Sequence, residues 1–224
     1  MVIIKTWGLC KFYDPTKTKE IRALYNVNLQ VGRGEFLVIR GPSGSGKTTL
    51  LSLIGALDRP TKGQIYLYGE DITNFSEAAL ARIRREKIGF VFQNFNLLPR
   101  LPAWENVTYP LIPVYPRARD RMKWAQELLE RFQLEDRFYH SPEEMSGGEQ
   151  QRVAIARALV NDPEIIIADE PTSNIDAESI ENLVGILKTM KMEGRTILMA
   201  THERSIFPLA DAFLDLKRGQ PVGE

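Results

Sequence analysis

The sequence predicts an α/β protein that combines a mainly parallel central sheet, an N-terminal antiparallel β-subdomain and an inserted α-helical subdomain. From residue 35 to residue 200, buried strand-like runs alternate with stretches of helical periodicity, which is typical of a parallel sheet covered on both faces. Runs of β-branched and aromatic residues between turn signals dominate the first third of the chain and indicate an antiparallel sheet. A helical segment of about fifty residues interrupts the alternation.

The β-rich runs that predict the antiparallel sheet lie at residues 2–10, 26–31 and 64–69. A buried strand, EFLVIR at 35–40, leads directly into a glycine-rich loop, and the chain continues as a helix at 47–57. The loop therefore follows the carboxyl end of a strand, the edge at which ligands bind in parallel sheets.

The next stretch begins with a helix at 76–87, which Ser76 is expected to cap. The apolar run IGFVF at 88–92 predicts a strand, and prolines then break the pattern between 94 and 116. Helical spacing returns at 117–134, where apolar residues recur on one face.

The remainder of the chain returns to the alternating pattern. A helix is predicted at 151–160, and two buried strands at 164–169 and 195–200 are separated by a helix at 177–192. We expect a single domain made of two parts. The catalytic core with its β-subdomain spans about 1–94 and 146–224, and the helical subdomain spans about 95–145.

Composition and charge restrict the classes of function. The 224 residues contain 29 Lys and Arg against 29 Asp and Glu, which gives no electrostatic case for binding nucleic acid. Cys10 is the only cysteine, which excludes an internal disulfide and a cysteine-based metal cluster. No run approaches the roughly 18 apolar residues of a membrane span, and the N-terminus does not resemble a signal peptide. We therefore expect a cytoplasmic protein whose membrane partner, if it has one, is another polypeptide.

A phosphate-binding loop is predicted at residues 41–48, GPSGSGKT, which match the pattern G-x-x-x-x-G-K-[ST]. The glycines let backbone N–H groups face phosphate oxygens, Lys47 adds a positive charge, and the Thr48 hydroxyl is a ligand for Mg²⁺. An ordinary strand–turn–helix junction is the weaker interpretation, because the required strand and helix flank the match. The predicted nucleotide-binding residues are Gly41, Pro42, Ser43, Gly44, Ser45, Gly46, Lys47, Thr48 and Thr49. The loop alone is compatible with an ATPase, a GTPase or a small-molecule kinase.

Polar residues lie at the carboxyl ends of three other predicted strands, at the same sheet edge as the phosphate loop: Asp169 and Glu170, Gln93, and His202. Asp169 can hold Mg²⁺ through water, and Glu170 can polarise a water molecule for attack on a γ-phosphate. The amide of Gln93 can bridge Mg²⁺ or water, and the imidazole of His202 can contact the γ-phosphate. Each of these residues taken singly is more often a solvated surface group, so the prediction depends on their combination.

A second glycine pair, Gly147 and Gly148, lies within EEMSGGEQQR at 143–152. Ser146 and Glu149 form a predicted capping box, which by itself accounts for a helix start. Glycine costs about 1 kcal/mol per helical position relative to alanine, so we expect that another group approaches the bare backbone closely. The free N–H groups and the dipole at the helix start favour an anion.

Six motifs in a fixed order resemble those of the nucleotide-binding subunits of ATP-binding-cassette (ABC) transporters: the phosphate loop at 41–48, Gln93, MSGGE at 145–149, Asp169-Glu170, Ser173-Asn174-Ile175-Asp176, and His202. The resemblance covers nearly the whole chain. It implies a P-loop NTPase (RecA-like) core that binds ATP and Mg²⁺ and hydrolyses ATP. It also implies an aromatic residue that stacks on adenine, for which Tyr13 fits by position and Phe12 is the alternative.

The departures from the family pattern remove no group that the chemistry requires. They are Met145, Glu149, Ser173, Ile175 and Glu203. A small-molecule kinase would have no reason to carry MSGGE, which favours the ATPase interpretation.

The resemblance further implies a homodimer. Two copies pack head to tail, so that ATP held by residues 41–48 of one chain meets residues 146–149 of the other. ATP joins the copies, and hydrolysis releases them and moves an attached permease. The predicted ATP contacts therefore also include Ser146, Gly147, Gly148 and Glu149.

Within the family, residues 87–112 resemble the branch of macrolide-export and lipoprotein-releasing ATPases (MacB/LolD type), whose permeases are FtsX-like. This implies a subunit on the inner face of the cell membrane. The cell-division ATPase FtsE is a close cousin, which leaves open a regulatory, force-transmitting role in cell-wall hydrolysis. A soluble ATPase acting on DNA or ribosomes would show a basic face, a coiled-coil insert or two cassettes, and the sequence has none.

We expect the permease to dock on the segment 94–116, with core packing as the alternative, through the apolar residues Phe95, Leu97, Leu98, Leu101 and Trp104.

Overall fold

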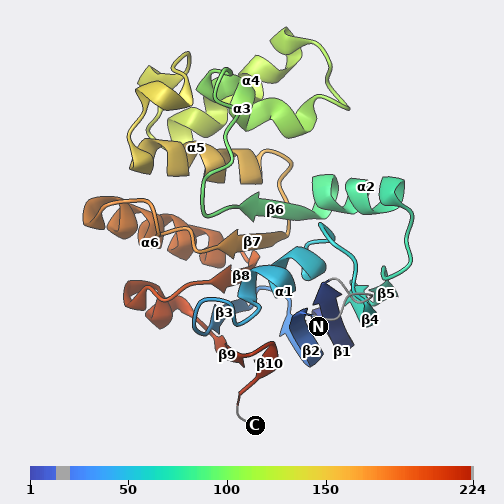
Figure 1. Cartoon of the computed structure of the whole chain (residues 1–224). Helices are drawn as coiled ribbons and strands as arrows, with labels where there is room; N and C mark the ends of the chain where they lie inside the picture. Colours follow the sequence, from blue (N-terminus) through green and yellow to red (C-terminus); the bar gives the residue numbers. More distant parts are fainter. Residues whose placement is uncertain (14–20, 223–224) are drawn as a thin grey trace.

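The computed structural model describes residues 1–13 and 21–222. These residues form a six-stranded central sheet with the order β10-β9-β3-β8-β7-β6 and a four-stranded sheet with the order β2-β1-β4-β5 (Figure 1). The strands are β1 (Val2–Tyr13), β2 (Ile21–Gly32), β3 (Phe36–Arg40), β4 (Lys62–Leu67), β5 (Glu70–Asp71), β6 (Ile88–Val91), β7 (Ile165–Asp169), β8 (Thr196–Ala200), β9 (Ala212–Lys217) and β10 (Gln220–Pro221). The α-helices are α1 (Lys47–Ile54), α2 (Glu77–Lys87), α3 (Ala103–Thr108), α4 (Ala118–Arg131), α5 (Gly147–Leu159) and α6 (Ala177–Met192).

The central sheet is parallel across β9, β3, β8, β7 and β6, whereas β10 pairs antiparallel with β9. All residues of β7 from Ile165 to Ala168 are buried, as expected for a strand that is covered on both faces. The parallel direction brings the carboxyl ends of the strands to one edge, where Asp169 of β7 pairs with Ala200 of β8. The predicted fold class is confirmed.

Alternate side chains of the central strands enter two hydrophobic clusters on opposite faces of the sheet. Ile165 and Ile167 belong to the cluster that contains α1 and the antiparallel sheet. Ile166 and Ala168 belong to the other cluster, which contains residues of α3, α4, α5 and α6. The period-two alternation of a strand produces this division. Helix α1, which follows the phosphate loop, and helix α5, which begins within MSGG, therefore pack on opposite faces of the central sheet.

The antiparallel sheet forms as predicted, with β1 between β2 and β4. Strand β2 starts at Ile21, well before the predicted run, and Leu24, Val27 and Val31 are buried along it. Because β2 begins at Ile21, its first residues include Ala23, which lies beside the phosphate loop. A Cβ on Gly46 would lie 2.5 Å from the Ala23 carbonyl oxygen.

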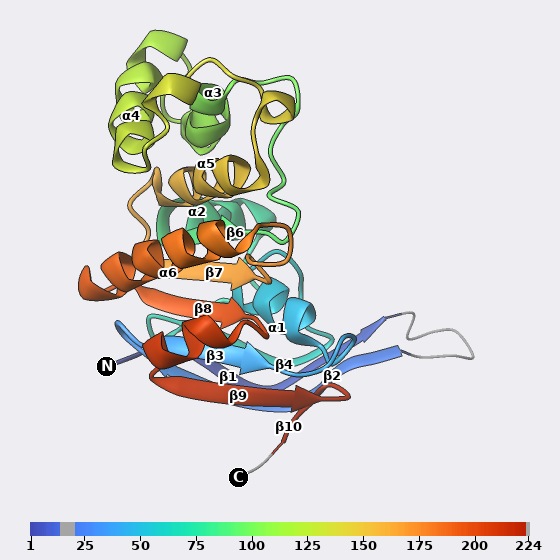
Figure 2. The ribbon, with the colours of Figure 1, turned by 90° about the vertical axis from the view of Figure 1, so that its left-hand side faces the viewer.

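Helices α3 and α4 stand above α5 and away from the central sheet (Figures 1 and 2). Helix α3 falls within the segment where prolines break the sequence pattern. Pro102 occupies its N-cap position, and Pro110 lies in the 3₁₀ helix η1 (Tyr109–Leu111) directly after it. Proline is tolerated at these positions because no N–H is required there. The helices share one core with the sheet, because Val107 and Leu129 pack in the same cluster as Ile155 of α5.

Three further 3₁₀ helices complete the described elements: η2 (Glu135–Arg137), η3 (Pro142–Glu144) and η4 (Arg204–Leu209). The division of the chain into a core and a helical subdomain at about 95 and 145 stays a prediction. Within residues 1–13 and 21–222, each helix is too short or too polar to cross a membrane.

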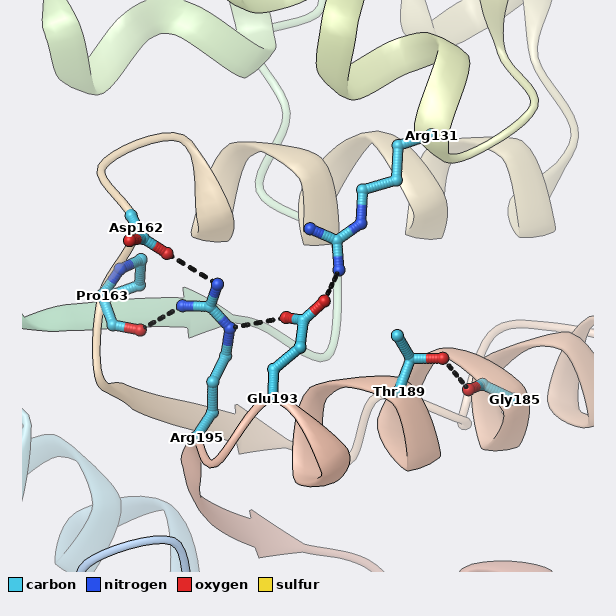
Figure 3. Close-up of polar contacts among 7 residues, drawn as sticks. All are labelled: Arg131, Asp162, Pro163, Gly185, Thr189, Glu193 and Arg195. Atoms are coloured by element: carbon cyan, nitrogen blue, oxygen red, sulfur yellow. Dashed lines mark hydrogen bonds and ion pairs between the residues drawn. The ribbon is translucent and has the colours of Figure 1, made fainter.

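An ionic junction joins the end of α4 to the end of α6 (Figure 3). Glu193, the C-cap residue of α6, accepts hydrogen bonds from Arg131 of α4 and from Arg195 Nε, the latter at 3.2 Å. Arg195 also donates to Asp162 at 2.7 Å and to the carbonyl of Pro163, in the turn before β7. We call these residues the Glu193 junction. It attaches the far end of the helical segment to the central sheet.

Candidate active site

A cleft of about 630 Å³ opens at the carboxyl edge of the central sheet. Most of the predicted site residues line it: Tyr13, the nine residues Gly41 to Thr49, Gln93, Glu170 and His202. Four further residues line it that we did not predict as site residues: Ile21, Arg22, Ala23 and Ser173. The first three belong to the early part of β2, whose start the sequence pattern placed too late.

The phosphate loop wraps around the side-chain amine of Lys47. Its Nζ donates to the Gly41 carbonyl at 2.8 Å. Gly41 and Gly46 have φ values of 147° and 104° and leave no room for a side chain, because a Cβ on Gly41 would lie 2.2 Å from the Leu216 carbonyl oxygen. A Cβ on Gly44 would meet no atom within 4 Å, so this part of the loop is open towards the cleft. The loop, followed by α1 from Lys47, can therefore present backbone N–H groups to an anion.

Glu170 is held between Lys47 and His202. Its Oε1 lies 3.5 Å from Lys47 Nζ, and its Oε2 lies 3.0 Å from His202 Nδ1. The backbone of Glu170 adopts φ 44°, a left-handed conformation that costs a non-glycine residue about 1–3 kcal/mol. Its N–H donates to the Ala200 carbonyl at 2.8 Å, which fixes this conformation at the strand end. The carboxylate is thus aimed at the cleft together with a cation and an imidazole.

Asp169 lies beside the phosphate loop, near the side chain of Thr48, and both residues line the same small cavity. Its Oδ1 is buried and has no hydrogen-bond partner. Burial raises the pKa of Asp169, the Glu170 carboxylate adds to the rise, and Thr48 and Lys47 reduce it. A carboxylate oxygen that is buried, unpaired and next to a hydroxyl fits a hydrated divalent cation. The residues therefore fit Mg²⁺ ligated by Thr48 and Asp169.

The described residues contain no group of three or more His, Cys, Asp or Glu side chains that could hold a metal ion alone. Mg²⁺ does not require such a group, because it retains several waters and takes phosphate oxygens as ligands. Gln93 can add an amide oxygen, since it lies shortly after β6 and is one of the residues that line the cleft. Its carbonyl accepts a hydrogen bond of 2.8 Å from the Asn174 side chain.

The helix start at MSGG forms the predicted capping box. Ser146 Oγ accepts from the Glu149 N–H at 3.2 Å, and Glu149 Oε2 accepts from the Ser146 N–H at 2.8 Å. Partial burial works against ionisation of Glu149, but the Ser146 backbone and Arg137 outweigh it and hold the pKa of this carboxyl below its ordinary value. Residues 146–149 are not among the residues that line the cleft.

The glycine pair has close neighbours in its own chain. A Cβ on Gly147 would lie 2.7 Å from the Asn174 carbonyl oxygen, and a Cβ on Gly148 would lie 2.1 Å from Ser179 Oγ. We expected a group to approach this backbone closely, and the structure shows that the loop after Glu170 and the start of α6 do so. Packing within the chain therefore accounts for the glycines by itself, and their assignment to a partner's nucleotide stays a prediction.

The two candidates for the adenine-stacking residue are in different environments. Tyr13 lines the cleft and is 41% exposed, with Lys11 Nζ 5.1 Å from its ring centroid. Phe12 instead stacks on Tyr25 at a centroid distance of 6.5 Å, and the guanidinium carbon of Arg22 lies 5.8 Å from the Phe12 ring centroid. Of the two, Tyr13 has the position from which an aromatic ring can reach a base in the cleft.

Comparison with known proteins identifies the family. Residues 24–173 match the model of the ABC transporter family. An uncharacterized ABC transporter ATP-binding protein of Thermotoga maritima is 44% identical over 223 residues, which cover 100% of this chain and 94% of the relative. The macrolide export ATP-binding/permease protein MacB of Bdellovibrio bacteriovorus is 45% identical over 98% of this chain, but the match covers only 33% of MacB.

A solved structure supports the same assignment. The ATP-binding cassette MJ0796 of Methanocaldococcus jannaschii, in a dimeric post-hydrolysis state bound to ADP and Pi, superposes with a TM-score of 0.91. The match has 43% sequence identity and covers 99% of this chain and 97% of that chain. The chain belongs to the ABC transporter family and is one of its ATP-binding cassettes, an ATPase.

Proposed function

We propose that the chain binds ATP and Mg²⁺ in the cleft and hydrolyses ATP as a head-to-tail homodimer that drives a separate, FtsX-like membrane permease. One observation carries the proposal. The cleft gathers the phosphate loop, Gln93, Glu170 and His202, while the helix start at Ser146 lies outside it. A second copy of the chain is the simplest way to bring this helix start into contact with the nucleotide in the cleft. The dimeric state of MJ0796 with ADP and Pi supports this arrangement.

The side chains take distinct roles in this reaction. Lys47 and the N–H groups of residues 41–48 bind the phosphates. The phosphate replaces Glu170 as the partner of Lys47, and the Glu170 carboxylate becomes free. Glu170 then polarises the attacking water, and His202 Nδ1 holds the other carboxylate oxygen in place. Thr48, Asp169 and Gln93 hold Mg²⁺, which neutralises charge on the phosphate oxygens when bound.

The head-to-tail arrangement gives the capping box at Ser146 and Glu149 a second purpose. The structure leaves Ser146 exposed at the start of α5, where helix N–H groups and the dipole favour an anion. Asn174 and Ser179 fill the space beside the α-carbons of Gly147 and Gly148 within the chain. The partner's γ-phosphate would therefore approach these glycines from the side that faces away from Asn174 and Ser179. The isologous two-fold symmetry of such a dimer yields two equivalent sites.

The permease partner is proposed from the MacB-type relatives and from the helical segment. Two of the predicted docking residues are wrong, because Phe95 and Trp104 are only 9% and 8% exposed, and Trp104 packs in the hydrophobic cluster with α3 and α4. Leu98, another residue of the predicted set, is exposed, and further exposed apolar side chains follow it in the chain at Tyr109, Ile112, Val114 and Tyr115. We propose that the cytoplasmic helix of the permease covers this surface, with the chain held on the inner face of the cell membrane.

A regulatory role of the FtsE kind, in which the ATPase cycle controls cell-wall hydrolysis, is the alternative. It uses the same cleft and dimer, so identification of the membrane partner by pull-down decides between the two. A partner that lacks an export substrate and binds a cell-wall hydrolase would favour the alternative.

The Glu170→Gln variant tests the proposed function. We expect it to bind ATP, to lose turnover and to become a stable ATP-dependent dimer, because the amide accepts no proton from water but preserves the shape. Gel filtration with ATP and a phosphate-release assay measure both effects. Glu70→Gln, the same change at an exposed position of β5, is the matched control. A Glu170→Gln protein that remains monomeric with ATP, or retains turnover, overturns the proposal.

A further inference from the structure

The end of strand β1 is attached to the loop that follows α1, residues 55–61. The Phe12 N–H donates to the Thr61 hydroxyl at 3.0 Å. Helix α1 starts at Lys47 in the phosphate loop. The segment that would bind phosphates at one end is therefore attached, at its other end, to the strand that carries Tyr13.

Lys11 makes the charged contacts of this attachment. Its Nζ donates to Asp58 Oδ1 at 2.7 Å and to the Arg59 carbonyl at 2.8 Å. Partial burial works against ionisation of Asp58, but Lys11 and the Arg59 N–H outweigh it and hold the pKa of this carboxyl below its ordinary value. The Asp58 carboxylate is therefore charged at neutral pH and fixes the Lys11 ammonium, whose side chain is only 13% exposed.

The same ammonium lies over the ring of Tyr13, with Nζ 5.1 Å from the ring centroid. Tyr13 lines the cleft, whereas Lys11 and Asp58 are not among the described residues that line it, so a ligand there meets the ring and not the cation. The faces of aromatic rings are negative and repel each other when two rings stack. A cation over one face of the tyrosine reduces this repulsion and holds the ring in place, which favours a base on the cleft side.

We propose that Lys11 is a positioning residue for the nucleotide base: held by Asp58, it packs behind the Tyr13 ring and presents the cleft side of the ring to adenine. The inference rests on the proposed function, because Lys11 has this effect only if ATP binds in the cleft with its base at Tyr13. Lys11 then contributes to the affinity for the base and not to the affinity for the phosphates. The Tyr13 hydroxyl adds little, because it reaches Asp58 Oδ2 only at 3.4 Å.

Lys11→Met tests this role, because methionine removes the charge and keeps an unbranched, flexible side chain. Lys191→Met is the matched control. Lys191 Nζ also donates to a carboxylate, Asp211 Oδ1 at 2.6 Å, and to a carbonyl, that of Leu209 at 2.8 Å. It lies near the end of α6 and is not among the described residues that line the cleft. The two variants lose the same kinds of polar contact, but only Lys11→Met loses a contact with Tyr13.

Isothermal titration calorimetry with ATP and with inorganic tripolyphosphate separates the base from the phosphates. For Lys11→Met we expect the dissociation constant of ATP to rise about 3- to 10-fold and that of tripolyphosphate to stay unchanged. In steady-state hydrolysis, KM should rise by a similar factor while kcat stays unchanged, because the reacting groups are not altered. In the Tyr13→Ala background, Lys11→Met should have no further effect on ATP binding. Lys191→Met should bind both ligands like the unchanged protein.

Three outcomes overturn the inference alone. Lys11→Met binds ATP like Lys191→Met, it weakens ATP and tripolyphosphate by the same factor, or its effect on ATP persists undiminished in the Tyr13→Ala background. The second outcome would indicate that Lys11 only stabilises the end of α1. An unchanged protein that binds neither ATP nor tripolyphosphate overturns the proposed function, and the role of Lys11 with it, so the two failures are distinguishable.

Discussion

The substitution Gly148→Ala tests whether the glycine pair is required by contacts within the chain. Gly148 is buried at the start of α5, and an added Cβ would lie 2.1 Å from Ser179 Oγ and 3.0 Å from Ser179 Cβ. The hydroxyl can rotate away, but the Cβ is fixed to the backbone of α6. The substitution therefore forces the two helix starts apart.

The expected loss follows from two opposing contributions. Overpacking at a tight contact costs about 1–3 kcal/mol, while alanine in a helix gains about 1 kcal/mol over glycine. The net loss of about 1 kcal/mol lowers the thermal midpoint of a chain of this size by about 2–4 °C. Gly185→Ala is the matched control, because Gly185 lies within α6 with no atom within 4 Å of an added Cβ. The control should raise the midpoint instead.

Thermal denaturation followed by circular dichroism measures these shifts. The double variant Gly148→Ala/Ser179→Gly removes the steric conflict, so a double-mutant cycle should give a favourable coupling of about 1 kcal/mol. A Gly148→Ala midpoint at or above that of the unchanged protein, or strictly additive losses, refutes the steric argument. ATP hydrolysis by the double variant answers a separate question. Activity that stays lost despite restored stability would indicate that the bare backbone also serves the partner's nucleotide.

Two further predictions concern the cleft. Burial raises the pKa of Asp169 in the folded state, so the stability that this group contributes is present when it is protonated and is lost as pH rises through the raised pKa. We therefore expect metal-free Asp169→Asn to have a higher thermal midpoint than the unchanged protein at about pH 8, and we expect the difference in midpoint to shrink as pH falls towards about 4. A difference in midpoint that does not change with pH contradicts this explanation. Base stacking on an aromatic ring is worth about 1–3 kcal/mol, so Tyr13→Ala should weaken ATP binding about 5- to 150-fold, whereas Tyr13→Phe and Phe12→Ala should change it by less than about threefold. Isothermal titration calorimetry measures the affinities, and the opposite order would assign stacking to Phe12.

Much of the fold could be predicted because local patterns and tertiary contacts agree. The run from Ile165 to Asp169 is apolar up to its last residue, and the helix at 177–192 begins at an Asp cap and has the predicted bounds. The alternation of strands and helices then determines a parallel sheet, and the sheet edge brings Gln93, Glu170 and His202 to the phosphate loop.

The parts that were missed depend on contacts between distant residues. Strand β9 (Ala212–Lys217) contains Asp215, which breaks the apolar run, yet Arg40 of β3 pairs with this carboxylate at 2.6 Å and the strand joins the sheet. Nothing near Gly148 in the sequence indicates that Ser179 will fill the space beside it. Phe95 and Trp104 are apolar residues in a proline-rich segment, and whether such residues face a partner or the core is decided by the fold of the helices around them.

Two of the attachments of the helical segment respond to salt in opposite directions. One attachment is the shared hydrophobic cluster, which sulfate and phosphate salts strengthen because they are excluded from the protein surface. The other is the Glu193 junction, whose partly exposed charges are screened as ionic strength rises. Glu193 also lies at the negative end of the α6 dipole, which repels its carboxylate. Part of the attraction to Arg131 and Arg195 therefore offsets this repulsion, and only the remainder adds stability. The ionic composition of the solution therefore adjusts how firmly α4 is held to α6, independently of any nucleotide.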